Sequence, residues 1–236
     1  MNIVITGASR GIGKELTKFF ARDNNRIIII SRNSEKLKEL KNECENNNSK
    51  TKILPVSFDL EHIDDNIDEL INIISGFVDK VDILINNAGF LINKPFEKIS
   101  FRERERIYKI NVLAPMELIS NLLPLLKKSE KSHVVNISSM GGFQGSMKFA
   151  GLASYASSKA AIASLTECLA EEYKNTNISF NCLALGAVAT EMLAEAFPDY
   201  KARTTPKDMA EYIYNFAISG HKMFNGKILP VSNTTP

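Results

Sequence analysis

The residues best suited to chemistry in this sequence are Tyr155 and Lys159, four positions apart in the stretch Tyr-Ala-Ser-Ser-Lys. On a helix this spacing places both side chains on one face. A tyrosine with a pKa of about 10 is a weak acid–base group at neutral pH, but a neighbouring ammonium favours the phenolate and lowers that pKa. The pair therefore predicts proton transfer at a carbonyl or an alcohol, although an aromatic edge beside a solvated cation has the same spacing.

A second candidate site is the glycine-rich turn of residues 6–13, Thr-Gly-Ala-Ser-Arg-Gly-Ile-Gly, between a β-branched run and a helical pattern. Strand, glycine turn and helix open a dinucleotide-binding unit, in which backbone N–H groups receive a pyrophosphate. A P-loop is excluded, because Ala8 stands where its first glycine belongs and Glu15 where Ser or Thr is needed. The alternative is a tight turn without a ligand. The turn residues expected to hold the cofactor are Gly7, Ser9, Arg10, Gly11, Ile12 and Gly13.

The end of the second expected strand indicates which cofactor is bound. Residues 27–30 are all isoleucine, as in a parallel strand covered on both faces, and Arg32 follows shortly after. An enzyme for NAD usually carries an acid here, whereas an arginine suits the 2′-phosphate of NADP. Arg32, together with Arg10, therefore predicts NADP(H) in preference to NAD(H). Asp59 and Leu60 follow the third expected strand, where the adenine edge could be held.

These candidates fall on strands that alternate with helices. Strands are expected at residues 2–6, 27–30, 52–57, 81–85, 133–137, 178–183 and 227–231. This alternation predicts an α/β fold with one Rossmann-type, doubly wound parallel sheet of about seven strands and helices on both faces. We expect a single domain over residues 1–236, with a short substrate loop near residues 190–205. Helix starts are expected at Ser100, with Glu103 completing a capping box, and at Thr205.

Two further polar positions stand out. Asn86-Asn-Ala-Gly89 follows the fourth expected strand, at the edge where ligands lie in open parallel sheets. Asn111 falls inside a helical pattern, where asparagine has a poor propensity. It has either a functional role or that of a buried amide holding a kink, with Pro115 bending the helix nearby.

Composition excludes several classes of function. A net charge of +2 over 236 residues gives no reason to expect nucleic acid or an anionic membrane as partner. No apolar run approaches the ~20 residues of a membrane span, and the N-terminus does not resemble a signal peptide, so we expect a cytoplasmic protein. The three cysteines are expected to be reduced, with Cys168 and Cys182 packed inside. The histidines are scattered, and no metal site is expected.

The chain resembles the short-chain dehydrogenase/reductase family, in its short single-domain form, over essentially its whole length. Four ordered motifs carry the resemblance: Thr6-Gly-x-x-x-Gly11-x-Gly13, Asn86-Asn-Ala-Gly89, the strand end at Ser139, and Tyr155-x-x-x-Lys159. It implies that Tyr155 is the general acid/base and that Ser139 hydrogen-bonds the substrate oxygen. Lys159 would lower the tyrosine pKa and hold the nicotinamide ribose, and Asn111 would anchor a water that links Lys159 to solvent.

The resemblance also extends the cofactor site. Asn87 would contact the ribose and Asp59 the adenine, while Val188 and Thr190 match the segment that grips the carboxamide. The positions expected to bind the cofactor after the third strand are Asp59, Leu60, Asn87, Ala88, Gly89, Tyr155, Lys159, Gly186, Val188 and Thr190.

The sequence departs from the family pattern in three places. Leu185-Gly186 stands where the family usually has Pro-Gly. The gap of 16 residues before Tyr155 is longer than usual, which leaves Ser138 as an alternative to Ser139; we choose Ser139 because it aligns with the strand end. The chain ends Val-Ser-Asn-Thr-Thr-Pro instead of the common Asp-Gly-Gly, so the C-terminal contacts of tetrameric members are in doubt.

Two functions are weighed. The first is an NADPH-dependent reductase of a carbonyl substrate, such as a 3-oxoacyl thioester, a ketosteroid-like molecule or a small ketone. The loop of residues 191–205 contributes Met192, Leu193, Phe197 and Tyr200, which predicts an apolar pocket. The alternative is a regulator that senses NADP(H) without turnover, which would have no need of a proton donor. Serine hydrolase chemistry has less support than either, because the sequence has no G-x-S-x-G motif and no suitably placed histidine.

A homodimer or homotetramer is expected, built partly on the Tyr155 and Asn111 helices. Both have apolar residues on more than one side, and such a helix must be covered. The residues behind this expectation are Ala160, Ala163 and Leu169 on the first helix and Met116, Leu118 and Leu122 on the second.

Overall fold

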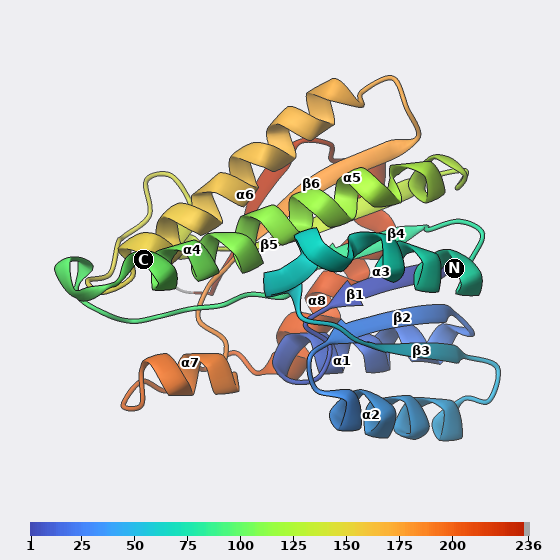
Figure 1. Cartoon of the computed structure of the whole chain (residues 1–236), viewed down its shortest axis with the longest axis horizontal. Coiled ribbons are helices and arrows are strands. Elements are labelled where there is room, and N and C mark those ends of the chain that lie inside the picture. Colours follow the sequence, from blue (N-terminus) through green and yellow to red (C-terminus); the bar gives the residue numbers. More distant parts are fainter. Residues whose placement is uncertain (234–236) are drawn as a thin grey trace.

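Parallel strands form one twisted sheet in the computed structural model, which describes residues 1–233 (Figure 1). The strands are β1 (Asn2–Thr6), β2 (Arg26–Ser31), β3 (Lys52–Ser57), β4 (Ile83–Asn86), β5 (Ser132–Ser139), β6 (Ile178–Leu185) and β7 (Lys227–Val231). Their order in the sheet is β3-β2-β1-β4-β5-β6-β7, and every neighbouring pair is parallel. The order reverses between β1 and β4, so the carboxyl ends of these strands diverge where open α/β sheets bind ligands.

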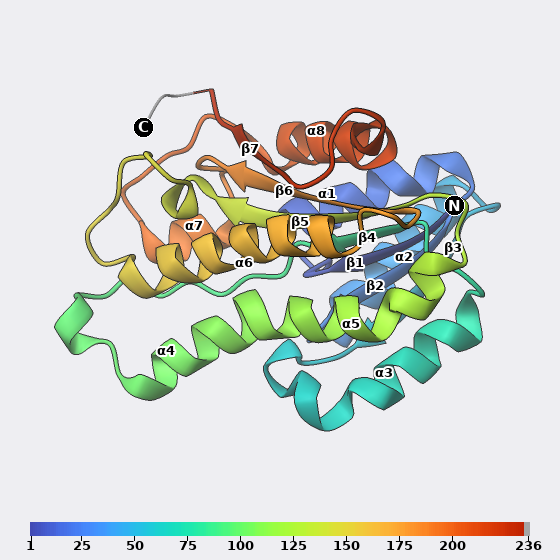
Figure 2. The same ribbon diagram turned by 90° about the horizontal axis from the view of Figure 1, so that it is seen from above.

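Helices cover both faces of the sheet. They are α1 (Gly11–Phe20), α2 (Ser34–Asn47), α3 (Ile63–Phe77), α4 (Phe101–Tyr108), α5 (Ala114–Lys127), α6 (Ala153–Glu172), α7 (Glu191–Ala196) and α8 (Pro206–Ser219). Figure 2 shows α1 and α8 on one side of the sheet and α3, α5 and α6 on the other. Among the described residues, no helix combines the length and apolar character needed to cross a membrane.

The isoleucines of β2 illustrate how the sheet is held. Residues 27–30 are all fully buried, and alternate side chains point to opposite faces. Ile27 and Ile29 join the core beneath α1 and α8. Ile28 and Ile30 join the core beneath α3 and α5. A strand with both faces covered needs an apolar residue at every position, which explains the uninterrupted run.

The expected fold class is confirmed, with differences at the element ends. β1, β3 and β7 have the predicted bounds, and the capping boxes at Ser100 and Thr205 are formed. β5 and β6 extend beyond their apolar runs, because backbone pairing continues through Ser138↔Ala184 and Ser139↔Leu185. The short helix α7 was not predicted; it begins where the Thr190 hydroxyl accepts a hydrogen bond from the Leu193 N–H.

The segment around Asn111 differs from the expected Pro115 bend. Residues Lys109–Leu113 form a π-helical turn between α4 and α5, and Pro115 lies in the first turn of α5. A π-helical turn adds one residue to the helix and is frequent at functional sites. It therefore changes the direction in which the buried Asn111 side chain points without breaking the helix.

Burial corrects two expectations about side chains. Cys168 is exposed on α6, whereas Cys44 and Cys182 are buried. Leu118, Leu122 and Ala163, offered as a reason for oligomerisation, lie in the core of the monomer because those sides of α5 and α6 face the sheet. Met116 and Ala160 remain exposed on these helices.

The histidines are less scattered than expected. The His133 and His221 ring centroids lie 5.6 Å apart. His133 Nδ1 lies 2.9 Å from the Ala217 carbonyl oxygen and Nε2 lies 3.0 Å from Asn181 Nδ2, which suits a neutral ring that donates from Nδ1 and accepts at Nε2. Burial lowers the His133 pKa to about 4. No group of three or more metal-ligating side chains occurs in residues 1–233.

The neutral His133 predicts a loss of stability in acid. Its pKa falls from 6.5 in the unfolded chain to about 4 in the folded one, so its contribution is complete above pH 6.5 and is lost as the pH falls toward 4. The loss should reach about 3 kcal/mol. We expect His133→Gln to be less stable than wild type at pH 7 but to lose less stability by pH 4.5 in urea unfolding. Equal losses in the two proteins would contradict the assignment.

Candidate functional site

A cavity of about 500 Å³ opens at the carboxyl ends of the strands and gathers most of the predicted site. The predicted residues that line it are Gly7, Ser9, Arg10, Gly11, Ile12, Arg32, Asp59, Leu60, Asn87, Ala88, Gly89, Ser139, Tyr155, Lys159, Gly186, Val188 and Thr190. Gly13 and Asn111 lie outside the lining. Segments far apart in the sequence therefore converge on one continuous space.

The glycine turn follows β1 and leads directly into α1. Gly7 has a φ of 68°, and a Cβ there would lie 2.8 Å from the Ala88 Cα. A Cβ at Gly13 would lie 2.3 Å from the Gly7 carbonyl oxygen. Gly7 therefore permits the left-handed turn, and Gly13 permits close packing of α1 on the turn instead of lining the cavity.

Asn87 joins the end of β4 to this turn. Its Nδ2 donates to the Thr6 carbonyl oxygen at 2.9 Å, and the Thr6 hydroxyl oxygen accepts from the Asn87 and Ala88 N–H groups at 3.1 and 3.0 Å. These bonds fix the two loops at the switch point of the sheet. The amide nitrogen of Asn87 is thus already engaged within the protein.

Two arginines, Arg10 and Arg32, line the cavity where the glycine turn and the end of β2 meet, which we call its outer end. They differ in their ion pairs. Arg32 is exposed after β2, and among the described residues its guanidinium forms no ion pair. Arg10 instead pairs with Glu195 of α7, with 2.5 Å between Nη1 and Oε1. Asp59 is also partly engaged, because Oδ1 accepts from the Glu61 N–H at 3.1 Å.

At the inner end of the cavity, where Tyr155 and Lys159 lie, the two candidate serines have different hydrogen-bond partners. The Ser138 hydroxyl donates to the Lys159 carbonyl oxygen at 2.6 Å, beneath α6. The Ser139 hydroxyl points the other way, as alternation along a strand requires, and is hydrogen-bonded to Tyr155. The structure therefore brings Ser139, and not Ser138, to the Tyr155 hydroxyl.

The pKa values of the Tyr155–Lys159 pair differ from the simple expectation. Burial raises the pKa of Tyr155 to about 12, and the hydrogen bond from Ser139 only partly opposes this. Lys159 Nζ lies 5.9 Å from the tyrosine ring centroid and donates to the Ile137 carbonyl oxygen at 2.9 Å. Burial lowers the Lys159 pKa to about 8. The pKa of Tyr155 therefore lies above its usual value, and not below it as predicted from the neighbouring lysine, because desolvation outweighs the Ser139 hydrogen bond.

Asn111 is held by a set of hydrogen bonds that spans three elements. Its Oδ1 accepts from the Phe90 N–H at 2.7 Å, and its Nδ2 donates to the Phe90 carbonyl oxygen and the Ser158 hydroxyl, both at 2.9 Å. A Cβ at Gly89 would lie 3.4 Å from Lys159 Nζ and 3.6 Å from Asn111 Oδ1. Asn111 therefore stands behind Gly89, beside the lysine, and fixes the loop that follows β4.

The sequence reasoning missed three kinds of residue. Apolar side chains outside the 190–205 loop also line the cavity, and they include Phe90, Leu91, Met140, Phe149 and Leu152. Ser158 bridges Asn111 to the Tyr155 carbonyl oxygen, which it contacts at 2.7 Å. Glu195 pairs with Arg10. Only Ser158 had a sequence signal, its place three residues after Tyr155.

Comparisons with known proteins agree with this geometry. A family model described as short chain dehydrogenase matches residues 1–201. The fatty acyl-CoA reductase of Acinetobacter baylyi is 32% identical over 213 residues, covering 89% of this chain and 70% of that protein. The 3-oxoacyl-(acyl-carrier-protein) reductase FabG of Aquifex aeolicus is 30% identical over 203 residues, covering 85% and 79%. A short chain dehydrogenase of Shigella flexneri, crystallised with NADP, has a TM-score of 0.87 and 30% identity, covering 97% and 95%.

The bonds of Asn111 predict a structural cost for its removal. Asn111→Ala leaves the part-buried Phe90 backbone N–H and carbonyl oxygen without their partner, and we expect the free energy of unfolding to fall by about 1–3 kcal/mol. Asn121→Ala on α5 is the matched control, since Asn121 is half-buried and bonds mainly within its own helix; it should cost less than about 1 kcal/mol. Denaturant unfolding compares them, and equal losses would show that the Asn111 bonds contribute little.

Proposed function

The chain belongs to the short-chain dehydrogenase/reductase family, and on that basis we propose that it is an NADPH-dependent reductase of carbonyl substrates. It is an oxidoreductase of this family, acting between carbonyl and alcohol groups. The observation that carries the finer proposal is the single cavity that joins the glycine turn and Arg32 to Ser139, Tyr155 and Lys159. A dinucleotide and a carbonyl substrate could therefore bind next to each other in this cavity.

The glycine turn fits a dinucleotide. Gly7 and Gly11 have positive φ values of 68° and 54°, and both line the cavity where α1 begins. The N-terminal N–H groups of α1 and its dipole would hold the pyrophosphate there. Asn87, Tyr155 and Lys159 would face the nicotinamide half, and Gly186, Val188 and Thr190 would face its carboxamide. When bound, the cofactor supplies a hydride to the substrate carbon.

The preference for NADP(H) rests on the exposed guanidinium after β2. Arg32 lines the cavity, no acidic residue accompanies it at that strand end, and Ser31 donates to the Ser9 hydroxyl at 2.7 Å beside it. An unpaired guanidinium can bind a phosphate through two parallel hydrogen bonds. The Shigella flexneri relative crystallised with NADP supports this choice.

The residues at the inner end are arranged to give a proton. With a pKa of about 12, Tyr155 holds its proton at neutral pH and can donate it to an oxygen that gains negative charge. The Ser139 hydroxyl, bonded to Tyr155, would orient that oxygen. Lys159 carries most of its charge below its pKa of about 8, and it would stabilise the phenolate left by proton donation. Asn111 would keep the Gly89 loop and Lys159 in place.

The substrate is proposed to be apolar near its carbonyl group. Apolar and aromatic side chains in the cavity lining include Phe90, Leu91, Met140, Phe149, Leu152, Met192, Leu193, Phe197 and Tyr200. In the part of the chain that the structure describes, the cations that line the cavity are Arg10, Arg32 and Lys159. A 3-oxoacyl thioester fits this character, as the names of the Acinetobacter and Aquifex relatives suggest; a ketosteroid-like molecule and a small ketone are the other candidates.

The proposed assembly is a homodimer or homotetramer. Apolar side chains that remain exposed at the start of α5 include Leu113 and Met116, with exposed fractions of 48% and 40%. Together with Ala160 on α6, they leave an apolar surface that a second copy would cover.

Arg32→Asp tests the cofactor preference. We expect wild type to bind NADPH more tightly than NADH, and the variant to lose at least about tenfold in NADPH affinity, because a charge-assisted pair is removed and a repulsive charge added. Fluorescence titration with both cofactors measures this. Lys36→Asp, at an exposed position on α2 that forms no ion pair in the described chain, controls for net charge. Equal wild-type affinities for NADPH and NADH would contradict the preference.

Tyr155→Phe tests the proton donor. The variant keeps the ring and its packing and removes only the hydroxyl, so NADPH affinity should barely change while kcat for a reduced ketone falls by ~10²–10⁴. NADPH oxidation against a ketone panel, including 3-oxoacyl thioesters, identifies the substrate and measures kcat. If the variant retains near-wild-type turnover, the proton comes from another group. If wild type binds NADPH but reduces no ketone, the sensor without turnover is the better account.

A further inference from the structure

Arg10 is occupied by an acidic residue from a distant part of the chain. Its Nη1 and Nη2 lie 2.5 and 3.4 Å from Glu195 Oε1 and Oε2, across a separation of 185 residues. The hydrogen bond that Arg10 donates to Glu195 is the main reason that the Arg10 pKa is raised. The fork of the guanidinium therefore already faces a bidentate anion inside the protein.

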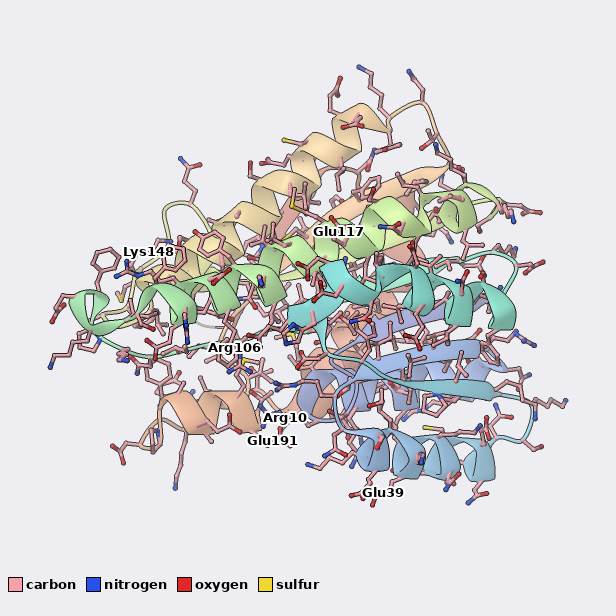
Figure 3. All side chains as sticks on the ribbon, in the orientation of Figure 1. Arg10, Glu39, Arg106, Glu117, Lys148 and Glu191 are labelled. Carbon is pink, nitrogen blue, oxygen red and sulfur yellow. The ribbon has the colours of Figure 1, made fainter. Side chains whose placement is uncertain are left out.

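The acidic residue is carried by α7, which stands over the glycine turn. Thr190, at the start of α7, lies against Gly11, where a Cβ would be 3.3 Å from the Thr190 methyl carbon. At the other end, Asn93 Nδ2 donates to the Ala196 carbonyl oxygen at 2.9 Å. Figure 3 shows Arg10 and Glu191 close together where α7 meets the turn, and Glu191 adds a second negative charge near the guanidinium.

We infer that Glu195 is a specificity-determining residue, which competes with the 2′-phosphate of NADP(H) for Arg10. This rests on the proposed binding of NADP(H) in the cavity. A phosphate and a carboxylate both require the same planar fork, so Arg10 cannot serve both fully. NADP(H) must take Arg10 from Glu195, whereas NAD(H) makes no such demand. Glu195 thus restrains the preference that Arg10 and Arg32 create.

The size of the effect follows from exposure. The side chains of Arg10 and Glu195 are 41% and 64% exposed, and exposed pairs shift an equilibrium by no more than about fivefold. By reciprocity, the cofactor that takes Arg10 weakens the attachment of α7 to the glycine turn by the same factor. The pair therefore couples the position of α7 to the presence of a 2′-phosphate.

The test is Glu195→Gln, which keeps the shape of the side chain and removes its charge. NADPH and NADH are titrated by fluorescence into the full chain. We expect the dissociation constant for NADPH to fall about two- to fivefold, with that for NADH unchanged. Glu39→Gln is the matched control, because Glu39 is exposed on α2 away from Arg10 (Figure 3) and forms no ion pair in the described chain; it should change neither constant.

A second variant separates competition for Arg10 from simple charge repulsion. In an Arg10→Gln background, Glu195→Gln should no longer affect NADPH binding. An undiminished gain without Arg10 would overturn the inference, as would equal changes for NADPH and NADH or no change in Glu195→Gln. If wild type binds neither cofactor, the proposed function fails as well; tight wild-type binding without a gain in Glu195→Gln overturns only the role of Glu195.

Discussion

The Lys159 side chain is buried close to Tyr155, and the surrounding residues are arranged to accommodate its charge. Only 4% of the residue is exposed, and its ammonium donates to the Ile137 carbonyl oxygen. A cation removed from water is costly unless it is hydrogen-bonded or paired, and burial lowers its pKa to about 8. Gly142 allows the backbone of α6 to lie close at this point, because a Cβ there would be only 2.6 Å from the Lys159 carbonyl carbon. The protein thus accepts an unfavourable burial to keep a cation beside Tyr155.

Two buried hydrogen bonds between β5 and α6 fix the position of α6 along the sheet. The Ser138 hydroxyl donates to the Lys159 carbonyl oxygen at 2.6 Å. Further along α6, the Thr166 hydroxyl accepts a hydrogen bond from Asn136 Nδ2 at 2.9 Å. Both pairs are buried, where an unmade hydrogen bond costs more than a made one contributes. α6 therefore cannot slide along β5 without breaking both. This register sets Tyr155 opposite Ser139, on the same strand that supplies Ser138 and Asn136.

The sequence predicted features whose cause is local. Apolar runs such as residues 27–30 and the capping box at Ser100 specify their own structure, and the glycine spacing predicted the turn. Features that depend on residues far apart in the chain could not be predicted from the sequence. The pairing of Arg10 with Glu195 requires α7 to fold over the turn, and the π-helical turn at Asn111 depends on bonds to Phe90 and Ser158. The raised pKa of Tyr155 was missed for the same reason, because spacing reveals a neighbouring charge but not the loss of solvent.

The two ends of the cavity use positive charge under opposite conditions. Arg10 and Arg32 are at least partly exposed at the outer end, so water and salt screen them, and one acidic side chain on α7 pairs with Arg10. Lys159 is enclosed at the inner end, where the low dielectric strengthens its field but also weakens its hold on a proton. The charge at the outer end can therefore change through surface substitutions that leave the fold intact. Substitutions at the inner end would disturb the fold as well. Ser138, Gly142 and Asn111 pack against or hydrogen-bond to Lys159 or its neighbouring segments, so each supports both the fold and the position of the lysine.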